Sequence, residues 1–305
     1  MLSHLPKLLL TIVFSFPLMI SSTACDGNAG GFGGGGGDGD GGGGDGGGGG
    51  DGGGGDGGGG AACKKIDLIF SVDGSGSMTE ELQAIRDDVF PAFATALINV
   101  ADGLEDFRVG VIDACPTPAN YHTRGNGGEC NFSSGQVWME SSSPNLAGEF
   151  ACVGDLDTQS NCPNSGPDQD EQPASAAVAS ILESANSGFL RDDALLVVVA
   201  ITDEDEQPVP MKNADDVYDS LVAIKGNVNK MVFYGIGGEP PTGCQGIPGT
   251  YGTALGATKL RAITQRFEDN QRGVWHDLCQ GRLEDGLTQA LAVIESACED
   301  FPPID

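Results

Sequence analysis

A glycine-rich segment sets the first limit on what this chain can fold into. Of the 31 residues from Gly30 to Gly60, 25 are glycine, five are aspartate and one is Phe32. Such a segment has almost no side chains to bury, so no core forms in it. We expect a flexible tether with an end-to-end distance of ~30 Å. A calcium-binding Gly/Asp repeat is the alternative, but it needs a periodic apolar residue that this segment lacks.

The N-terminus has the features of an export signal. Lys7 precedes the apolar run Leu8–Phe14, and small residues follow. This pattern is typical of a secretory signal, and the run is too short to span a membrane.

The residues Ser22-Thr23-Ala24-Cys25 at the end of this signal resemble a bacterial lipobox, with Ser22 where that pattern prefers leucine. The resemblance implies a signal peptide over residues 1–24, a lipid on Cys25 and a linker over residues 25–60. It also implies a cell-envelope protein held by its lipid anchor, on the outer membrane or the periplasmic face. The alternative is an ordinary signal cut near Ala24, which leaves Cys25 as a thiol.

The remaining cysteines also indicate export. Eight are left after Cys25, namely Cys63, Cys115, Cys130, Cys152, Cys162, Cys244, Cys279 and Cys298. An even number in an exported chain predicts disulfides. Domain termini often lie close together, so we predict a Cys63–Cys298 bridge, which would remove roughly 5 kcal/mol of unfolded-state entropy. The other pairings stay open.

The formal net charge is −29, from 44 acidic and 15 basic side chains. A chain this acidic is a poor partner for nucleic acids and anionic lipid headgroups. The charge suits cations, basic partners or simple solubility.

Residues 61–305 are long enough for one substantial core. Apolar strands alternate with helical patterns, which predicts an α/β fold with a doubly wound, mostly parallel sheet between two helical layers. The expected strands are Ile66–Val72, Phe107–Ala114, a short one near Val137–Met139, Ala194–Thr202, Lys230–Ile236 and Gly273–His276. The expected helices are Leu82–Val100 with a kink at Pro91, Gln172–Ser187, Ala214–Lys225, Lys259–Phe267 and Leu283–Ala297.

Two acidic residues stand at the carboxyl ends of expected strands, where open α/β sheets bind ligands. Asp73 follows the first strand, and Asp203 follows the most apolar one. Ser75 and Ser77 lie on the turn after Asp73, and the glycines between them allow a tight turn. Carboxylate and hydroxyl oxygens are hard ligands, which favours Mg²⁺ and also admits Ca²⁺ or Mn²⁺.

The segment Asp73-Gly-Ser75-Gly-Ser77-Met78 is similar to the D-x-S-x-S signature of von Willebrand factor A domains, and Val199–Asp203 resembles the apolar strand of that fold that ends in Thr-Asp. The order of elements fits over roughly residues 64–299. The resemblance implies a metal-ion-dependent adhesion site in which Asp73, Ser75, Ser77 and Asp203 hold the metal. It also implies an open coordination position that a carboxylate of a protein partner fills.

The sequence departs from that family in one segment. The family supplies a threonine from a glycine-rich loop between the two motifs, but this chain has Asn164-Ser-Gly-Pro-Asp-Gln-Asp-Glu171 there. Ser165, Asp168 and Glu171 are the candidates for the third contribution. An acidic residue would make the site more anionic, favour Ca²⁺ and weaken the attraction for an acidic ligand group.

Other functions were weighed against the same residues. Ser77 and Glu80 fit a helix capping box. A phosphatase of the haloacid dehalogenase type needs an aspartate nucleophile where this chain has Ser71. Nucleophile-elbow, H-E-x-x-H and P-loop motifs are absent, and His122 and His276 are more typical of structural residues. We therefore predict a binding module and not an enzyme. A metal-assisted hydrolase and a purely structural envelope protein are the alternatives.

Overall fold

The fold was taken from a computed structural model. It describes residues 63–99, 106–116, 119, 121–125, 127–154, 156, 162, 171–183, 188–206, 213–245 and 252–301. These lie in the second of two compact units, which covers Asp56–Asp305. The predictions for the signal peptide, Cys25 and the glycine-rich tether fall outside the described residues. No helix within the described part of the chain is long and apolar enough to cross a membrane.

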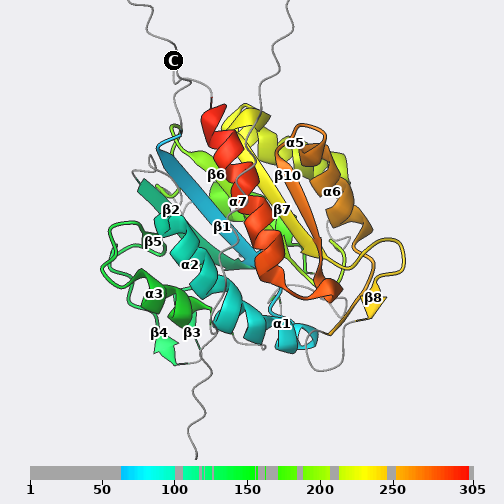
Figure 1. The fold of residues 1–305 in the computed structure, drawn as a ribbon, viewed down its shortest axis with the longest axis horizontal. Coiled ribbons are helices and arrows are strands. Elements are labelled where there is room, and N and C mark those ends of the chain that lie inside the picture. The colour runs from blue at the N-terminus through cyan, green and yellow to red at the C-terminus, as the bar shows by residue number, and fades with distance from the viewer. Residues whose placement is uncertain are drawn as a thin grey trace, which may run out of the picture. The chain divides into compact units, whose positions relative to one another are not determined.

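A six-stranded sheet forms the centre of this unit, in the order β10-β7-β6-β1-β2-β5 (Figure 1). Five strands are parallel, and only the edge strand β5 is antiparallel. The strands are β1 (Lys65–Val72), β2 (Asp106–Asp113), β5 (Met139–Glu140), β6 (Leu195–Ile201), β7 (Met231–Gly237) and β10 (Gly273–Asp277). β6 is buried along its whole length, as expected for a parallel strand covered on both faces.

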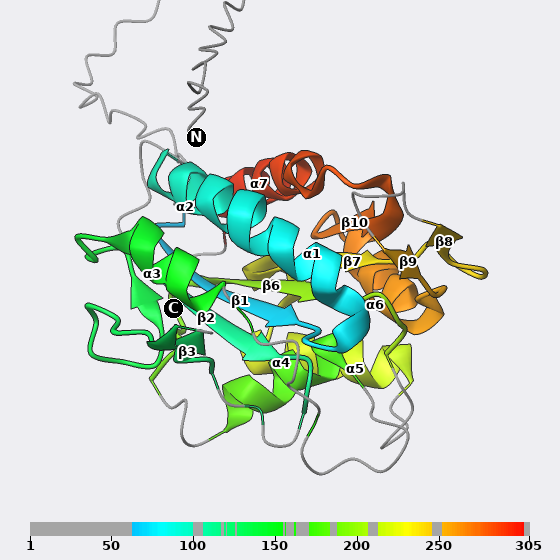
Figure 2. The same ribbon diagram turned by 90° about the horizontal axis from the view of Figure 1, so that it is seen from below.

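Helices cover both faces of the sheet. Figure 2 shows α1, α2 and α7 on one side of the sheet and α4 and α5 on the other. The bounds are α1 (Thr79–Ala84), α2 (Phe90–Asn99), α3 (Leu146–Val153), α4 (Pro173–Leu182), α5 (Ala214–Lys225), α6 (Thr258–Glu268) and α7 (Leu283–Glu299). Side chains alternate along the strands, so that Val197 and Val199 of β6 join the core under α1, α2 and α7, whereas Val198 joins the core under α4, α5 and α6. The predicted three-layer α/β class is confirmed.

The expected elements are present with ends shifted by up to three residues, except that α4 ends at Leu182 and not at the expected Ser187, with Glu183 already extended. The expected kink near Pro91 takes a specific form. A π-helical stretch, Ile85–Val89, separates α1 from α2 just before Pro91. Proline has no N–H to donate to the preceding turn, and widened turns are one way in which a helix accommodates it. The cysteine-rich stretch contains helix α3, which was not predicted from the sequence. Two short antiparallel pairs lie outside the main sheet: β3 (Arg124–Gly125) with β4 (Gly128–Glu129), and β8 (Cys244–Gln245) with β9 (Thr253–Ala254).

All eight of these cysteines form disulfides. The predicted Cys63–Cys298 bridge is present and joins the start of β1 to the end of α7. The other pairs are Cys115–Cys162, Cys130–Cys152 and Cys244–Cys279.

Candidate metal centre

The order of the strands places a topological switch point between β1 and β6. The chain leaves β1 through α1 and α2 toward β2 on one side, and leaves β6 through α5 toward β7 on the other. Diverging connections leave an opening above the carboxyl ends of the two central strands, which is where open α/β sheets bind ligands. Asp73 and Asp203 stand at these ends, because β1 ends at Val72 and β6 ends at Ile201.

Asp73 forms the buried floor of the site. Its side chain is fully buried, and its backbone N–H donates to the carbonyl of Ile201, which extends the pairing of β1 with β6. The backbone N–H of Ser75 donates to Asp73 Oδ1 at 2.8 Å, and the Thr202 hydroxyl donates to Asp73 Oδ2 at 2.8 Å. These bonds fix the orientation of the carboxylate.

The two serines connect Asp73 to Asp203. Ser75 Oγ and Ser77 Oγ share a hydrogen bond of 2.8 Å, and Ser77 Oγ donates to Asp203 Oδ1 at 3.2 Å. Ser77 is exposed, Ser75 is half-buried, and Asp203 is only 3% exposed. The structure therefore brings all four predicted residues together, with buried carboxylates below and hydroxyls toward solvent.

The capping alternative for Ser77 is wrong. Helix α1 begins at Thr79, its N-cap position is Met78, and no side chain caps it by a hydrogen bond. The Ser77 hydroxyl points instead to Asp203, 126 residues later in the chain.

Of the three candidates for the third segment, Glu171 lies beside this centre, while Ser165 and Asp168 fall outside the described residues. Glu171 is buried, and the neighbouring N–H of Gln172 donates to the carbonyl of Ala114 at the end of β2. Burial and then the negative charge of Asp73 raise the pKa of Glu171 to about 7. Burial and the same neighbour raise the pKa of Asp203 to about 7.

Two acidic residues after Asp203 serve the surrounding helices. Asp205 accepts hydrogen bonds from the backbone N–H groups of Lys259 and Leu260, at the start of α6. Glu206 accepts from Ala174 and Ser175, at the start of α4. A helix N-terminus favours a negative charge. The starts of α6 and α4 therefore partly offset the charges of Asp205 and Glu206.

A buried acid near the amino ends of the strands provides a contrast. Asp67 is fully buried on β1, but Arg191 donates to it from both its side chain and its backbone. Among the described residues, neither Asp73 nor Asp203 forms an ion pair with a lysine or an arginine. After burial, the charges of Asp73, Glu204 and Glu81 raise the pKa of Asp203, and the hydrogen bond from Ser77 lowers it. Buried anions without a basic partner are costly, and a bound cation offsets that cost.

Two residues of the site, Thr202 and Glu81, were not predicted from the sequence. Thr202 was noticed only within the Thr-Asp pair, yet its hydroxyl holds Asp73. Glu81 is 1% exposed, the charge of Asp73 raises its pKa, and its own charge raises the pKa of Asp203. A signal was present, because Glu81 lies four residues before Ile85 and three after Met78, on the buried face of the helical pattern.

The histidines have contacts of their own. The His122 ring is hydrogen-bonded to Asp113 at 2.5 Å, and the buried His276 ring is hydrogen-bonded to the carbonyl of Gly281 at 2.9 Å. Neither contact involves Asp73 or Asp203.

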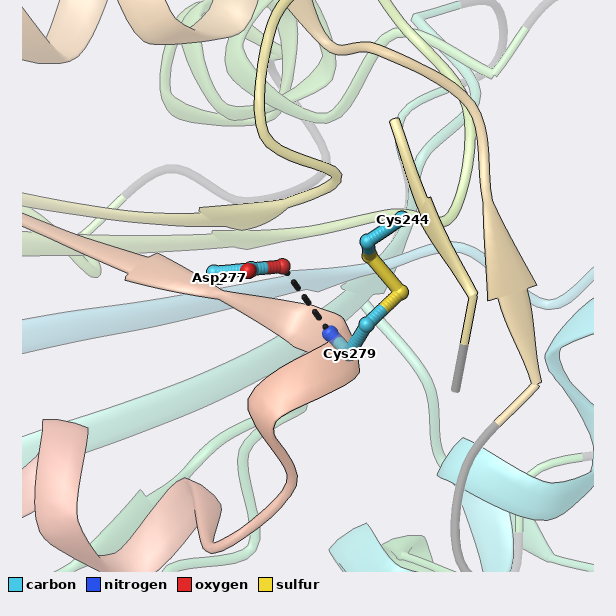
Figure 3. Close-up of side chains that lie close together, drawn as sticks. All are labelled: Cys244, Asp277 and Cys279. Carbon is cyan, nitrogen blue, oxygen red and sulfur yellow. Dashed lines mark hydrogen bonds between the residues drawn. A yellow bond between two sulfur atoms is a disulfide. The ribbon is translucent and has the colours of Figure 1, made fainter. Parts of the chain in front are cut away.

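A second group of potential metal ligands, Cys244, Asp277 and Cys279, does not form a metal site. Figure 3 shows that the two sulfur atoms are joined in a disulfide and that Asp277 accepts a hydrogen bond from the backbone of Cys279. Thiolates are the ligands that such a site would use, and the disulfide removes both.

Known proteins resemble this chain in structure but not in sequence. No family model matches the chain, and no curated protein matches it in sequence. In structure it is similar to the manganese-loaded TRAP protein of Plasmodium vivax, with a TM-score of 0.37 and 13% identity over 78% of this chain and 74% of that one. It is also similar to proximal thread matrix protein 1 of the mussel byssus with a zinc-occupied MIDAS motif, with a TM-score of 0.41 and 13% identity.

The alignment with the mussel protein covers 78% of this chain and 47% of the mussel protein, so the chain spans about half of that length. Likeness at this level does not by itself assign a family or a ligand to this chain.

Proposed function

We propose that the folded unit is a cation-dependent binding module, in which Asp73, Ser75, Ser77 and Asp203 hold a divalent metal. The observation that carries the proposal is the convergence of two buried carboxylates and two hydroxyls at the switch point of the sheet. All these donors are hard oxygens, which suit Mg²⁺, Ca²⁺ or Mn²⁺. Bound metal would supply positive charge to Asp73 and Asp203, which form no ion pair with a lysine or an arginine among the described residues.

Glu171 is our candidate for the third segment of the centre. Its buried carboxyl is close enough to Asp73 and Asp203 for their charges to raise its pKa. A third carboxylate favours Ca²⁺, which accepts more oxygen ligands than Mg²⁺ does.

The partner we propose is a protein that offers a carboxylate to the metal. Ser77 is exposed, so the metal position opens to solvent on the serine side. Asp73 and Asp203 together neutralise a divalent ion, and Glu171 and Glu204 add negative charge. The carboxylate would therefore bind by coordination, with little long-range attraction.

We further propose that Cys25 carries a lipid and that the glycine-rich segment presents the module at the cell envelope. The four disulfides support an oxidising compartment.

The test of the metal site is a titration of the purified protein with MgCl₂, CaCl₂ and MnCl₂, followed by calorimetry and thermal unfolding. Asp73→Asn keeps both hydrogen-bond acceptor positions but removes one charge, and we expect it to weaken cation binding at least tenfold. The matched control is Asp205→Asn, which removes a charge two residues from Asp203 and retains a cap for α6. It should leave the cation affinity within about twofold. Equal affinities for Asp73→Asn and the parent would refute the proposal.

A further inference from the structure

Glu81 lies on the buried face of its helical segment, where the neighbouring residues Met78, Leu82 and Ile85 are apolar. It lies in α1 between the exposed Glu80 and the buried Leu82, and its own exposed fraction is 1%. A carboxylate is almost never fully buried unless a partner stabilises it, so its contacts need an explanation.

The two oxygens of Glu81 have different surroundings. Oε1 accepts a hydrogen bond from the backbone N–H of Gly252 at 2.6 Å. Oε2 is buried and has no hydrogen-bond partner among the described residues. Leaving one oxygen of a buried carboxylate unpaired costs more than an ordinary hydrogen bond gains. Oε2 is therefore the atom that a ligand would satisfy.

Glu81 lies next to the proposed metal centre, because α1 begins two residues after Ser77 and because the Gly252–Leu255 segment joins Glu81 to Asp203. Burial raises the pKa of Glu81, and the negative charges of Glu80 and Asp73 raise it further. In turn, the charge of Glu81 raises the pKa of Asp203. The charge of Glu81 therefore acts on the switch point, although the residue comes from the helix and not from a strand end.

Glu81 also holds one end of a short strand that borders the site. Gly252 is bound to Glu81, and three residues later the N–H of Leu255 donates to the carbonyl of Asp203 at 2.7 Å. Between them lies β9, which pairs with β8. Cys244 of β8 is joined by a disulfide to Cys279, two residues after the end of β10. A side chain at position 252 would approach Glu81 Oε1 to 3.0 Å, so glycine permits this close contact.

We propose that Glu81 is a further acidic residue of the cation centre, which presents Oε2 to the bound cation while Oε1 fixes the Gly252–Leu255 segment at its rim. The inference rests on the proposed metal site. The inference adds that the Glu81 side chain links the cation to the Gly252–Leu255 segment, which a partner would contact. Cation binding should then order Gly252 and its neighbours.

Glu81→Gln tests the role of the charge, because glutamine retains an oxygen that can accept from Gly252. We expect cation affinity, measured with MgCl₂ and CaCl₂, to fall about tenfold or more. The cation-free protein should be as stable as the parent or more stable, because a repelling carboxylate is gone. Glu80→Gln is the matched control, since it removes an exposed charge from the adjacent position, and its affinity should stay within about twofold of the parent.

A purely structural role for Glu81 predicts the reverse, namely lower stability without cation and unchanged affinity, and that result would overturn the inference. If the parent protein binds neither cation, the proposed function fails together with it. If the parent binds and Glu81→Gln binds equally well, only the inference fails.

A second measurement needs no variant. Hydrogen exchange at the Gly252, Thr253 and Leu255 amides of the parent should slow when CaCl₂ is added, and unchanged exchange at a saturating cation concentration would contradict the proposal.

Discussion

At the scale of single residues, Thr202 shows how much of the site depends on a side chain that is not itself a proposed ligand. Its hydroxyl is fully buried, donates to Asp73 Oδ2 and accepts from the backbone N–H of Glu204. Groups that orient a metal ligand in this way influence metal affinity almost as strongly as the ligands. The same hydroxyl joins the two central strands just beyond their last paired residues.

Thr202→Val tests this role, because valine keeps the shape and removes the hydroxyl. We expect the free energy of unfolding to fall by about 1–3 kcal/mol, as for the loss of a hydrogen bond to a charged group. Cation affinity should fall by about tenfold. Chemical denaturation and calorimetry measure the two effects. A loss of stability with unchanged affinity would mean that Thr202 supports only the fold.

At the scale of elements, the segment after β6 links the site to two helices on the same face of the sheet. Asp203 belongs to the proposed centre, Asp205 holds the first turn of α6, and Glu206 holds the first turn of α4. The carboxylates of Asp205 and Glu206 satisfy N–H groups that a helix start leaves unpaired. The four residues Asp203–Glu206 therefore carry one carboxylate of the site and hold the starts of two helices.

Asp205→Ala should lower the free energy of unfolding by about 1 kcal/mol, as expected for the loss of an N-terminal cap. Asn213→Ala is the comparison, because Asn213 forms a capping box with Asp216 at the start of α5, away from the 203–206 segment. Denaturant unfolding should give similar losses for both variants. A loss several times larger for Asp205→Ala would show that the segment supports more than the first turn of α6.

At the scale of the whole unit, buried acids lie at both ends of the parallel strands. Near the amino ends, Asp67 is paired with Arg191. Glu171, Asp203 and Glu206 lie beyond the carboxyl ends, and each has its pKa raised to about 7, chiefly by burial. The folded chain without metal therefore binds protons that the unfolded chain releases near pH 4.

The stability of the cation-free protein should depend on pH accordingly. The folded-state pKa values lie above the ordinary values of 4.5 for Glu171 and Glu206 and 3.8 for Asp203. The stabilisation is therefore complete below those ordinary values and is lost as the pH rises through about 7. We expect a loss in the free energy of unfolding on the order of 3 kcal/mol for each of these three groups.

Thermal unfolding between about pH 4.5 and pH 8 checks this prediction. Saturating MgCl₂ should reduce the loss, because a bound cation stabilises the ionised carboxylates. Stability that rises with pH in the cation-free protein would contradict the assigned directions of the pKa shifts.

The α/β class and the first half of the candidate site follow from local patterns in the sequence. Strands such as Leu195–Ile201 are apolar without interruption, which is a local property. Asp73, Ser75 and Ser77 lie on one turn, so their spacing already places them together. The Cys63–Cys298 bridge was also predictable, because the ends of a domain tend to meet.

Only the tertiary structure decided which distant residues face that turn. The order of the strands brings Asp203 to Ser77, which lies 126 residues earlier in the chain. It also brings Glu171, just before α4, and Gly252, just before β9, to the carboxyl ends of the strands. Burial of Glu81 depends on packing of α1 against the sheet and on the position of Gly252. Contacts of this kind depend on how elements pack in three dimensions, whereas the periodicity of a sequence reports only which face of each element is buried.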